Sequence, residues 1–223
     1  MKVLVACEES QTVCKAFRKK GHEAYSCDIV ECSGGHPEWH IKGDVLPLLN
    51  GYCEFTLQNG QTDRQTDRWD LIIAHPPCTY MTTASACRMY HKHKNGNSYL
   101  DEDRVKKMIL SRDIFLAILH ADCDKIVIEN PTPMKIACLP EPTQIIQPYE
   151  FGHPYTKRTL LWNKGVKNLV PTQIIEPIKG SWVNGCATAY KRKGKENIFG
   201  KSSAKERSKT FEGIAQAMAD QWG

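Results

Sequence analysis

The sequence predicts an α/β fold in which helices cover both faces of a mostly parallel sheet. Two observations carry this prediction. Short runs such as 2–6, 69–74 and 125–128 are apolar at nearly every position, which is typical of strands buried on both faces. Segments with helical spacing of apolar residues alternate with these runs, and this alternation indicates a parallel sheet with helices packed on it.

The other strands follow from the same kind of signal. The expected strands span residues 2–6, 23–30, 69–74, 125–128, 144–147 and 159–162. In an open parallel sheet, ligands sit at the carboxyl ends of strands, near the point where strand order reverses. The side chains that follow these strands are therefore the first candidates for a functional site.

Three helices are expected from apolar spacing and from residues that favour helix ends. Ser10 is expected to cap the first helix and Gly21 to end it. Residues 103–121 have an amphipathic pattern, and residues 211–222 form the last helix. The buried side chains of these two later helices are expected to be Val105, Met108, Ile109, Ile114, Phe115, Ile118, Leu119, Phe211, Ile214, Ala215, Met218 and Trp222.

Loops are predicted where glycine, proline and polar residues gather. Residues 33–43 and 79–100 are expected to be loops, and loops as long as the second are usually functional or disordered. Residues 50–68 repeat Gln-Thr-Asp-Arg once and are expected to form a mobile surface excursion. Residues 163–209 are expected to be irregular and basic.

Composition narrows the class of protein. The 223 residues are 41% hydrophobic and 25% charged, as in ordinary soluble globular proteins, and no apolar run approaches the ~20 residues of a membrane helix. The first strand begins at once, which leaves no room for a signal peptide. The ten cysteines are scattered singly, so neither a metal site nor a disulfide framework is expected. We therefore expect a cytoplasmic protein without a membrane partner.

The positive charges are unevenly distributed. The formal charge is +5, and basic residues gather at 88–94 and at 191–209. Basic loops suit a phosphate backbone, although a solvated surface would look the same.

The turn after the first strand points to a cofactor without a pyrophosphate. Residues 6–12 contain no glycine, whereas dinucleotide and triphosphate sites need glycines so that backbone can approach the phosphates. S-adenosylmethionine fits such a turn. The expected binding residues are Ala6, Cys7, Glu8, Ser10 and Pro76, with Asp28 for the ribose diol and Asp44 for the adenine amino group. The alternative interpretation is that Asp28 and Asp44 are ordinary acidic residues in loops with no role in cofactor binding.

Cys78 is the candidate nucleophile. Most lone cysteines are small buried hydrophobes, but two prolines hold this one rigidly at a strand end, beside a basic loop expected to lower its pKa. A thiolate that attacks carbon 6 of cytosine makes carbon 5 able to accept a methyl group. Such an attack needs a general acid at ring nitrogen 3, and Glu129 is the candidate. The alternative interpretation is that Glu129 is an acidic residue at a strand end that caps a turn. Lys157 and Arg158 are candidates for the base carbonyl and the phosphate.

Together these residues resemble the DNA cytosine-5 methyltransferase family, in the short forms found in phages and prophages. Pro77-Cys78 corresponds to its proline-cysteine motif, and Glu129-Asn130-Pro131 to Glu-Asn-Val. Residues 152–159 resemble part of Gly-Val-Pro-Gln-x-Arg-x-Arg, with Tyr155 for Gln and Lys157 for the first Arg. The resemblance implies a Rossmann-like fold, S-adenosylmethionine, Cys78 as nucleophile, and Glu129 at nitrogen 3 and the exocyclic amine.

The resemblance also implies a division of the chain and a DNA partner. Residues 1–165 would be the catalytic domain, 166–207 a short basic region in place of a target-recognition domain, and 208–223 a helix that packs back on the catalytic domain. A base in a duplex must be flipped out, and residues 79–99 would close over it. The expected DNA-binding residues are Thr79, Tyr80, Arg88, Lys92, Asn130, Tyr155, Lys191, Arg192 and Lys193. Because 166–207 is short, specificity is expected to be low, or to come from a protein partner or an oligomer.

Three alternatives remain open. The first is transfer to an amino group, adenine N6 or cytosine N4, for which the motif is Asp, Asn or Ser before Pro-Pro and an aromatic; here His75 precedes the prolines and Tyr80 comes two places late. The second is cytosine-5 methylation of RNA or of a free nucleotide. The third is a nucleic-acid-binding module that has lost catalysis.

Overall fold

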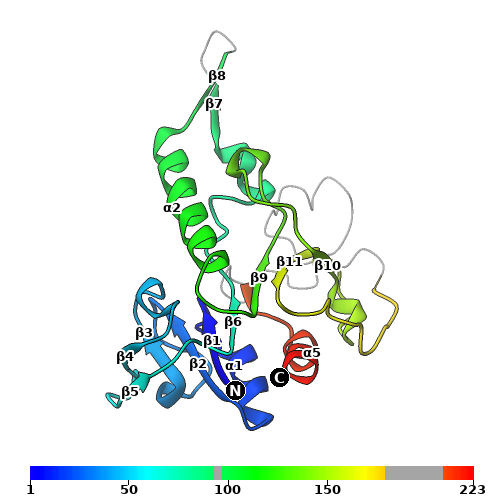
Figure 1. Ribbon diagram of the computed structural model, residues 1–223. Coiled ribbons are helices and arrows are strands. Elements are labelled where there is room, and N and C mark those ends of the chain that lie inside the picture. Colours follow the sequence, from blue (N-terminus) through cyan, green and yellow to red (C-terminus); the bar gives the residue numbers. More distant parts are fainter. Residues whose placement is uncertain (93–96, 179–207) are drawn as a thin grey trace.

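A computed structural model describes residues 1–92, 97–178 and 208–223 (Figure 1). Its centre is a seven-stranded sheet in the order β10-β11-β9-β6-β1-β2-β3. The strands are β1 (Lys2–Ala6), β2 (Glu23–Asp28), β3 (His40–Lys42), β6 (Leu71–Ala74), β9 (Ile126–Asn130), β10 (Gln144–Ile146) and β11 (Thr159–Lys164). Neighbours from β3 to β9 run parallel, while β11 is antiparallel to both β9 and β10. The predicted mostly parallel, Rossmann-like α/β fold is confirmed.

The strand order reverses between β1 and β6. From β1 the chain builds outward to β2 and β3, and it then returns to place β6 and β9 on the other side of β1. The backbone N–H of His75 donates to the carbonyl of Ala6 at 2.9 Å, so the segments that leave these two strands start side by side. A ligand site is expected at this reversal.

Helices cover both faces of the sheet. Helices α1 (Thr12–Lys19) and α5 (Glu212–Trp222) pack against each other on one face, while α2 (Glu102–Leu119) covers the other. Successive strand residues alternate between the two cores. Val3, Val5, Leu71, Ile73 and Val127 belong to the α1–α5 core, and Leu4, Ala6, Ile72, Ala74, Ile126 and Ile128 to the α2 core.

The first helix is capped differently from the prediction. Ser10 does not cap α1; its hydroxyl lies 3.1 Å from that of Thr12, and the residue before the helix is Gln11. The carboxylate of Glu8 instead accepts hydrogen bonds from the N–H groups of Val13 and Cys14 in the first turn of the helix. Gly21 follows the helix at a φ of 81°, a conformation that glycine adopts without strain.

Helix α2 begins after Asp101, whose side chain accepts from the N–H of Arg104 at 2.9 Å. Its buried positions are Met108, Ser111, Phe115 and Ile118. Ile109, predicted to be buried, is 36% exposed. The steps of three and four residues between the buried positions keep Ile109 off the packed face.

Three predicted loops contain strands. Residues 33–43 include β3, which pairs with β2 in parallel. Residues 50–68 form the hairpin β4 (Cys53–Thr56) and β5 (Thr62–Gln65) rather than an irregular excursion. Residues 79–100 include the hairpin β7 (Tyr90–Lys92) and β8 (Ser98–Leu100), which projects from the body beside the start of α2. Short 3-10 turns lie at Pro37–Trp39, Leu46–Leu48, Thr83–Arg88, Lys135–Ala137 and Pro148–Glu150.

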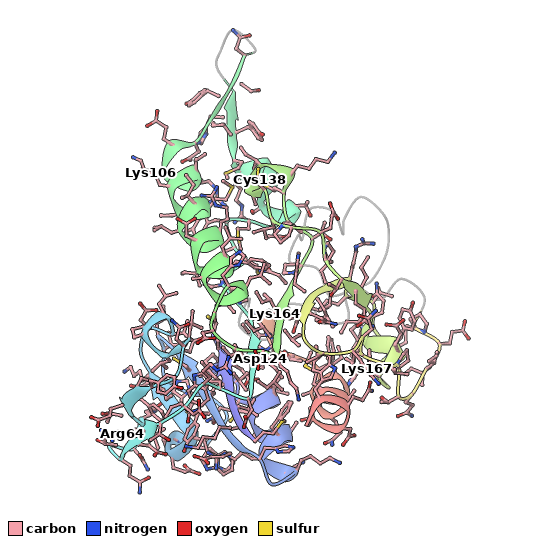
Figure 2. The ribbon with its side chains drawn as sticks, viewed as in Figure 1. Arg64, Lys106, Asp124, Cys138, Lys164 and Lys167 are labelled. Atoms are coloured by element: carbon pink, nitrogen blue, oxygen red, sulfur yellow. The ribbon has the colours of Figure 1, made fainter. Side chains whose placement is uncertain are left out.

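The two hairpins lie at different ends of the molecule. Figure 2 shows Arg64 of β5 far from Lys106, near the start of α2, where the β7–β8 hairpin projects. Within the described residues, no helix combines the length and the apolar character that a membrane crossing requires.

Candidate active site

The carboxyl ends of β1, β2, β6 and β9 surround a cavity of about 450 Å³. Residues from the chain before β11 and from the segment before α5 complete its wall. Of the residues singled out from the sequence, Cys7, Glu8, Ser10, Asp28, Pro76, Cys78, Thr79, Glu129, Asn130 and Lys157 line it. His75 and Thr210 also line it, although sequence reasoning gave neither of them a role there.

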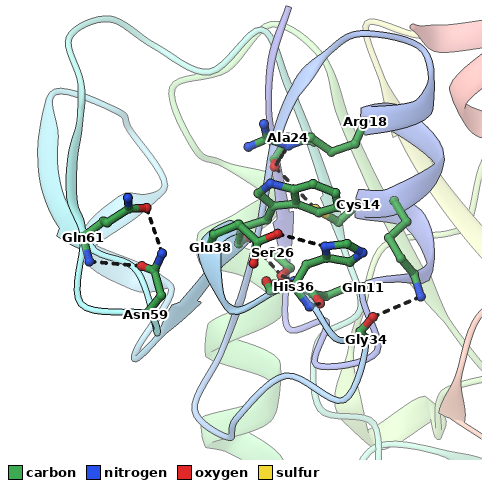
Figure 3. Close-up of polar contacts among 12 residues, drawn as sticks. Gln11, Cys14, Arg18, Ala24, Ser26, Gly34, His36, Glu38, Asn59 and Gln61 are labelled. Atoms are coloured by element: carbon green, nitrogen blue, oxygen red, sulfur yellow. Dashed lines mark hydrogen bonds and ion pairs between the residues drawn. The ribbon is translucent and has the colours of Figure 1, made fainter.

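The glycine-free turn after β1 is held in a strained shape by a neighbouring loop. Cys7 and Gln11 both have a φ of 58°, a left-handed conformation that costs a residue other than glycine about 1–3 kcal/mol. The Gln11 side chain accepts from the N–H of His36 at 3.0 Å and donates to its carbonyl at 2.8 Å (Figure 3). A Cβ on Gly34 would lie 2.5 Å from the carbonyl oxygen of Ser10. The glycine that allows close approach here thus comes from the adjacent loop.

Glu8 is a buried carboxylate held by backbone. It is 4% exposed and accepts from the N–H groups of Val13 at 2.7 Å and Cys14 at 3.2 Å. Burial raises its pKa, and the His75 charge and these two hydrogen bonds offset only part of the rise. Glu8 therefore caps α1 while its carboxylate also lines the cavity.

Asp28 and Asp44 lie in different surroundings. Asp28 lines the cavity at the end of β2, and burial raises its pKa. Asp44 is exposed, does not line the cavity, and accepts from the N–H of Leu46 at 3.0 Å. Ala6 is fully buried in the α2 core. Of these three predicted cofactor residues, only Asp28 faces the cavity.

Cys78 lies half-buried in a turn after the two prolines. Its carbonyl accepts from the N–H groups of Met81 and Thr82, each at 3.0 Å. Burial raises the pKa of its thiol, and the nearby charge of Lys157 only partly offsets that rise. The expectation that a basic loop lowers this pKa is therefore wrong, because burial outweighs the positive charge.

Glu129 is surrounded by donors from three other segments. Its carboxylate lies 3.1 Å from His75 Nδ1 and 3.8 Å from Lys157 Nζ, and it accepts from the Thr210 hydroxyl at 3.2 Å. Burial alone would raise its pKa, but the Lys157 charge, the His75 hydrogen bond and charge, and the Thr210 hydroxyl together lower it to about 2. Glu129 is thus ionised at any physiological pH.

His75 takes part in this cluster because of the register between strands. Ala74 of β6 lies opposite Ile128 of β9, so the next residues, His75 after the end of β6 and Glu129 within β9, lie at the same level. A signal for this pairing was in the sequence, because a histidine follows one buried strand and a carboxylate ends the next. Lys157 is positioned by its own N–H, which donates to the Gln147 side chain at 3.0 Å.

Asn130 presents an unused donor. It is 3% exposed and lines the cavity, and its side-chain nitrogen has no hydrogen-bond partner among the residues that the structure describes. A buried amide without a partner is costly. The donor is therefore a candidate contact for a ligand.

Several predicted DNA-binding residues lie outside the cavity. Tyr80 packs toward α2, with the Arg104 guanidinium 5.0 Å from its ring centre. Arg88 and Arg158 are exposed, and Tyr155 lies 5.9 Å from the Phe211 ring. The backbone of Lys92 belongs to β7. Lys191, Arg192 and Lys193 lie outside the described residues.

Comparisons with known proteins add a weak likeness. No protein-family model matches the chain, and no curated protein matches it. Among solved structures it is similar to an E. coli prophage protein that is provisionally named a DNA modification methyltransferase, at 13% identity and a TM-score of 0.45. The match covers 79% of this chain and 52% of that one, so the chain spans about half the length of that structure.

Proposed function

We propose that this protein methylates carbon 5 of cytosine in DNA, with S-adenosylmethionine as methyl donor and Cys78 as covalent nucleophile. The observation that carries the proposal is that Cys78, Glu129 and Lys157 line the same cavity as Asp28. Nucleophilic attack on carbon 6 of cytosine would use a thiol, a carboxylate and an ammonium group. A carboxylate at the end of β2 is what a ribose diol would use.

The β1–β2 end of the cavity has the right charge for the donor. Glu8, Glu9 and Asp28 bring carboxyl groups to it, and S-adenosylmethionine carries a positive sulfonium group. Asp28 would accept hydrogen bonds from the ribose hydroxyls, and Glu8 would face the positive part of the molecule. The cofactor would supply an electrophilic methyl group to carbon 5.

At the opposite end, the residues would act on the base. The Cys78 thiolate forms a bond to carbon 6, and the electron pair of the ring double bond makes carbon 5 nucleophilic. Glu129 would accept a hydrogen bond from the exocyclic amine, and Lys157 would supply positive charge beside it. After methyl transfer, a solvent base takes the proton from carbon 5, the electron pair of that C–H bond re-forms the ring double bond, and the Cys78 sulfur leaves carbon 6 as a thiolate.

The projecting hairpin supports a nucleic acid as substrate. Its strands expose Tyr90 and Tyr99, and Arg88 lies exposed at its base. Aromatic rings suit stacking on unpaired bases, and a two-stranded ribbon fits the DNA major groove. We therefore propose that this hairpin contacts the DNA beside the flipped base.

The test is trapping of the covalent intermediate. The protein is incubated with S-adenosylmethionine carrying a labelled methyl group and with DNA containing 5-fluorocytosine. In this base, fluorine replaces the hydrogen on carbon 5, so the last step cannot remove a proton and the covalent adduct persists. We expect a stable adduct from the wild type and from Cys87→Ser, which changes an exposed cysteine of the neighbouring 3-10 turn, but none from Cys78→Ser.

Other outcomes decide among the alternatives. An adduct that survives Cys78→Ser would refute the mechanism. Transfer of the label to adenine or to cytosine N4 in ordinary DNA would show an amino-group enzyme. Transfer to RNA or nucleotides alone would move the same chemistry to another substrate. DNA binding without any transfer would show a binding module.

A further inference from the structure

His75 is a buried histidine between two carboxylates. Its side chain is 15% exposed, and Nδ1 lies 3.1 Å from Glu129 Oε2. Its other ring nitrogen, Nε2, is buried and has no hydrogen-bond partner within residues 1–92, 97–178 and 208–223. The ring is placed by the end of β6, and its backbone is tied to β1 through Ala6.

The charged groups around His75 come from every element packed on it. Glu129 faces it from β9, Glu8 from the turn after β1, and Lys157 from the segment before β11. Burial alone would lower the pKa of His75, but the hydrogen bond to Glu129 and the charges of Glu129 and Glu8 outweigh burial and Lys157, and the pKa is raised. These neighbours therefore favour the protonated form of His75 beside an ionised Glu129.

This arrangement bears on how nitrogen 3 of cytosine obtains its proton. Attack by sulfur on carbon 6 pushes electron density toward nitrogen 3 of the ring. A general acid must therefore donate a proton to nitrogen 3. Glu129, with a pKa of about 2, carries no proton of its own to give. A proton has to reach it from a neighbour.

We propose that His75 is the positioning residue that holds this proton and passes it through Glu129 to nitrogen 3. The inference rests on the proposed cytosine-5 chemistry. As the bond between Cys78 sulfur and carbon 6 forms, the proton on His75 Nδ1 moves to Glu129 and the proton of the Glu129 carboxyl moves to nitrogen 3, which leaves His75 neutral. When the bond from sulfur to carbon 6 breaks, nitrogen 3 returns its proton along the same path. No other reactant is needed for these two transfers.

The alternative is that His75 only holds Glu129 in place. His75→Asn separates the two roles, because an asparagine amide can donate a hydrogen bond to Glu129 but cannot release a proton. His120→Asn is the matched control, since His120 is exposed at the end of α2 and remote from the cavity lining.

The experiment measures the rate of 5-fluorocytosine adduct formation between pH 5 and 10. The wild type needs a Cys78 thiolate and a protonated His75 at once, so its rate should rise and then fall with pH. We expect His75→Asn to be slower by ~100-fold or more at neutral pH and to lose the fall at high pH, while His120→Asn follows the wild type. A His75→Asn variant with the wild-type rate and profile would overturn the inference and leave the proposed function standing. Absence of any wild-type adduct would refute the proposed function first.

A second measurement does not depend on the variant folding. The ring of His75 is titrated by NMR in the wild-type protein and identified by comparison with His75→Gln or by sequential assignment. We expect the pKa of His75 to lie above the ordinary histidine value of about 6.5. A pKa below that value would overturn the inference whatever the variants do.

Discussion

The two ends of the cavity each contain a buried glutamate, and the two are held in opposite ways. Glu8, at the β1–β2 end, accepts hydrogen bonds from two backbone N–H groups of α1. Glu129, at the β9 end, lies against a histidine, a lysine and a threonine hydroxyl. Burial raises the pKa of Glu8, whereas that of Glu129 is lowered to about 2.

The difference shows that burial alone does not decide the charge of a carboxyl group. The His75 charge and the two N–H donors only partly offset the cost of removing Glu8 from water, while Lys157, His75 and the Thr210 hydroxyl together more than offset it for Glu129. At the end that would hold a cationic cofactor, burial thus leaves the pKa values of Glu8 and Asp28 raised. At the end that would act on the base, Glu129 stays ionised and its negative charge is balanced by Lys157 and His75.

Replacing Lys157 should disturb the β9 end most. Lys157→Met removes the cation that contributes most to the low pKa of Glu129 and leaves a buried carboxylate with only His75 as a charged partner. We expect the free energy of unfolding at pH 7 to fall by about 3 kcal/mol and adduct formation to slow by ~100-fold, measured by urea unfolding and by trapping. Arg158→Met, at the exposed neighbour, should leave the free energy of unfolding nearly unchanged and should slow adduct formation by no more than a few-fold. Equal effects would assign the role to both residues.

Opposite pH dependences should distinguish the two glutamates. In the unfolded chain both have a pKa of about 4.3. The lowered pKa of Glu129 stabilises the fold above that value by about 3 kcal/mol, and this is lost as the pH falls toward 2. The raised pKa of Glu8 means that the folded protein binds its proton first, so Glu8 favours the fold more as the pH falls.

Urea unfolding of Glu129→Gln and Glu8→Gln between pH 7 and 3 measures this contrast. Relative to the wild type, Glu129→Gln should become less destabilised as the pH falls, and Glu8→Gln more destabilised. Two curves with the same slope would contradict the distinction between the ends.

The sequence predicted the cavity because strand ends can be found without knowing any contact. Cys78 and Glu129 follow apolar runs, and the reversal of strand order at β1 and β6 brings them together with Asp28. Strand β3 was missed because its three residues lie among glycines and prolines. The hairpin β4–β5 was missed because its apolar content is low, and pairing buries only Phe55 and Gln65 of its strands.

Electrostatics could not be predicted in the same way. The pKa of Cys78 depends on how deeply the thiol is buried, and the sequence shows only the nearby basic residues. The His75–Glu129 pair depends on the register between β6 and β9, which periodicity does not fix. Asp44 was a candidate as an acidic residue in a predicted loop, but its side chain accepts from the N–H of Leu46 outside the cavity.

The smallest effect is expected at the β1–β2 end, where Asp28 and Asp44 were predicted to share the cofactor. Asp28→Asn replaces a charged acceptor by a neutral one at the cavity wall, so each hydrogen bond from the ribose diol weakens. We expect affinity for S-adenosylmethionine to fall by ~10-fold, about 1.4 kcal/mol, in calorimetry at pH 7.5. Asp44→Asn should bind like the wild type, because Asp44 lies outside the cavity lining. Unchanged affinity in Asp28→Asn together with loss in Asp44→Asn would mean that the adenosine lies along β3 instead, and would move the acidic end of the site to that edge of the sheet.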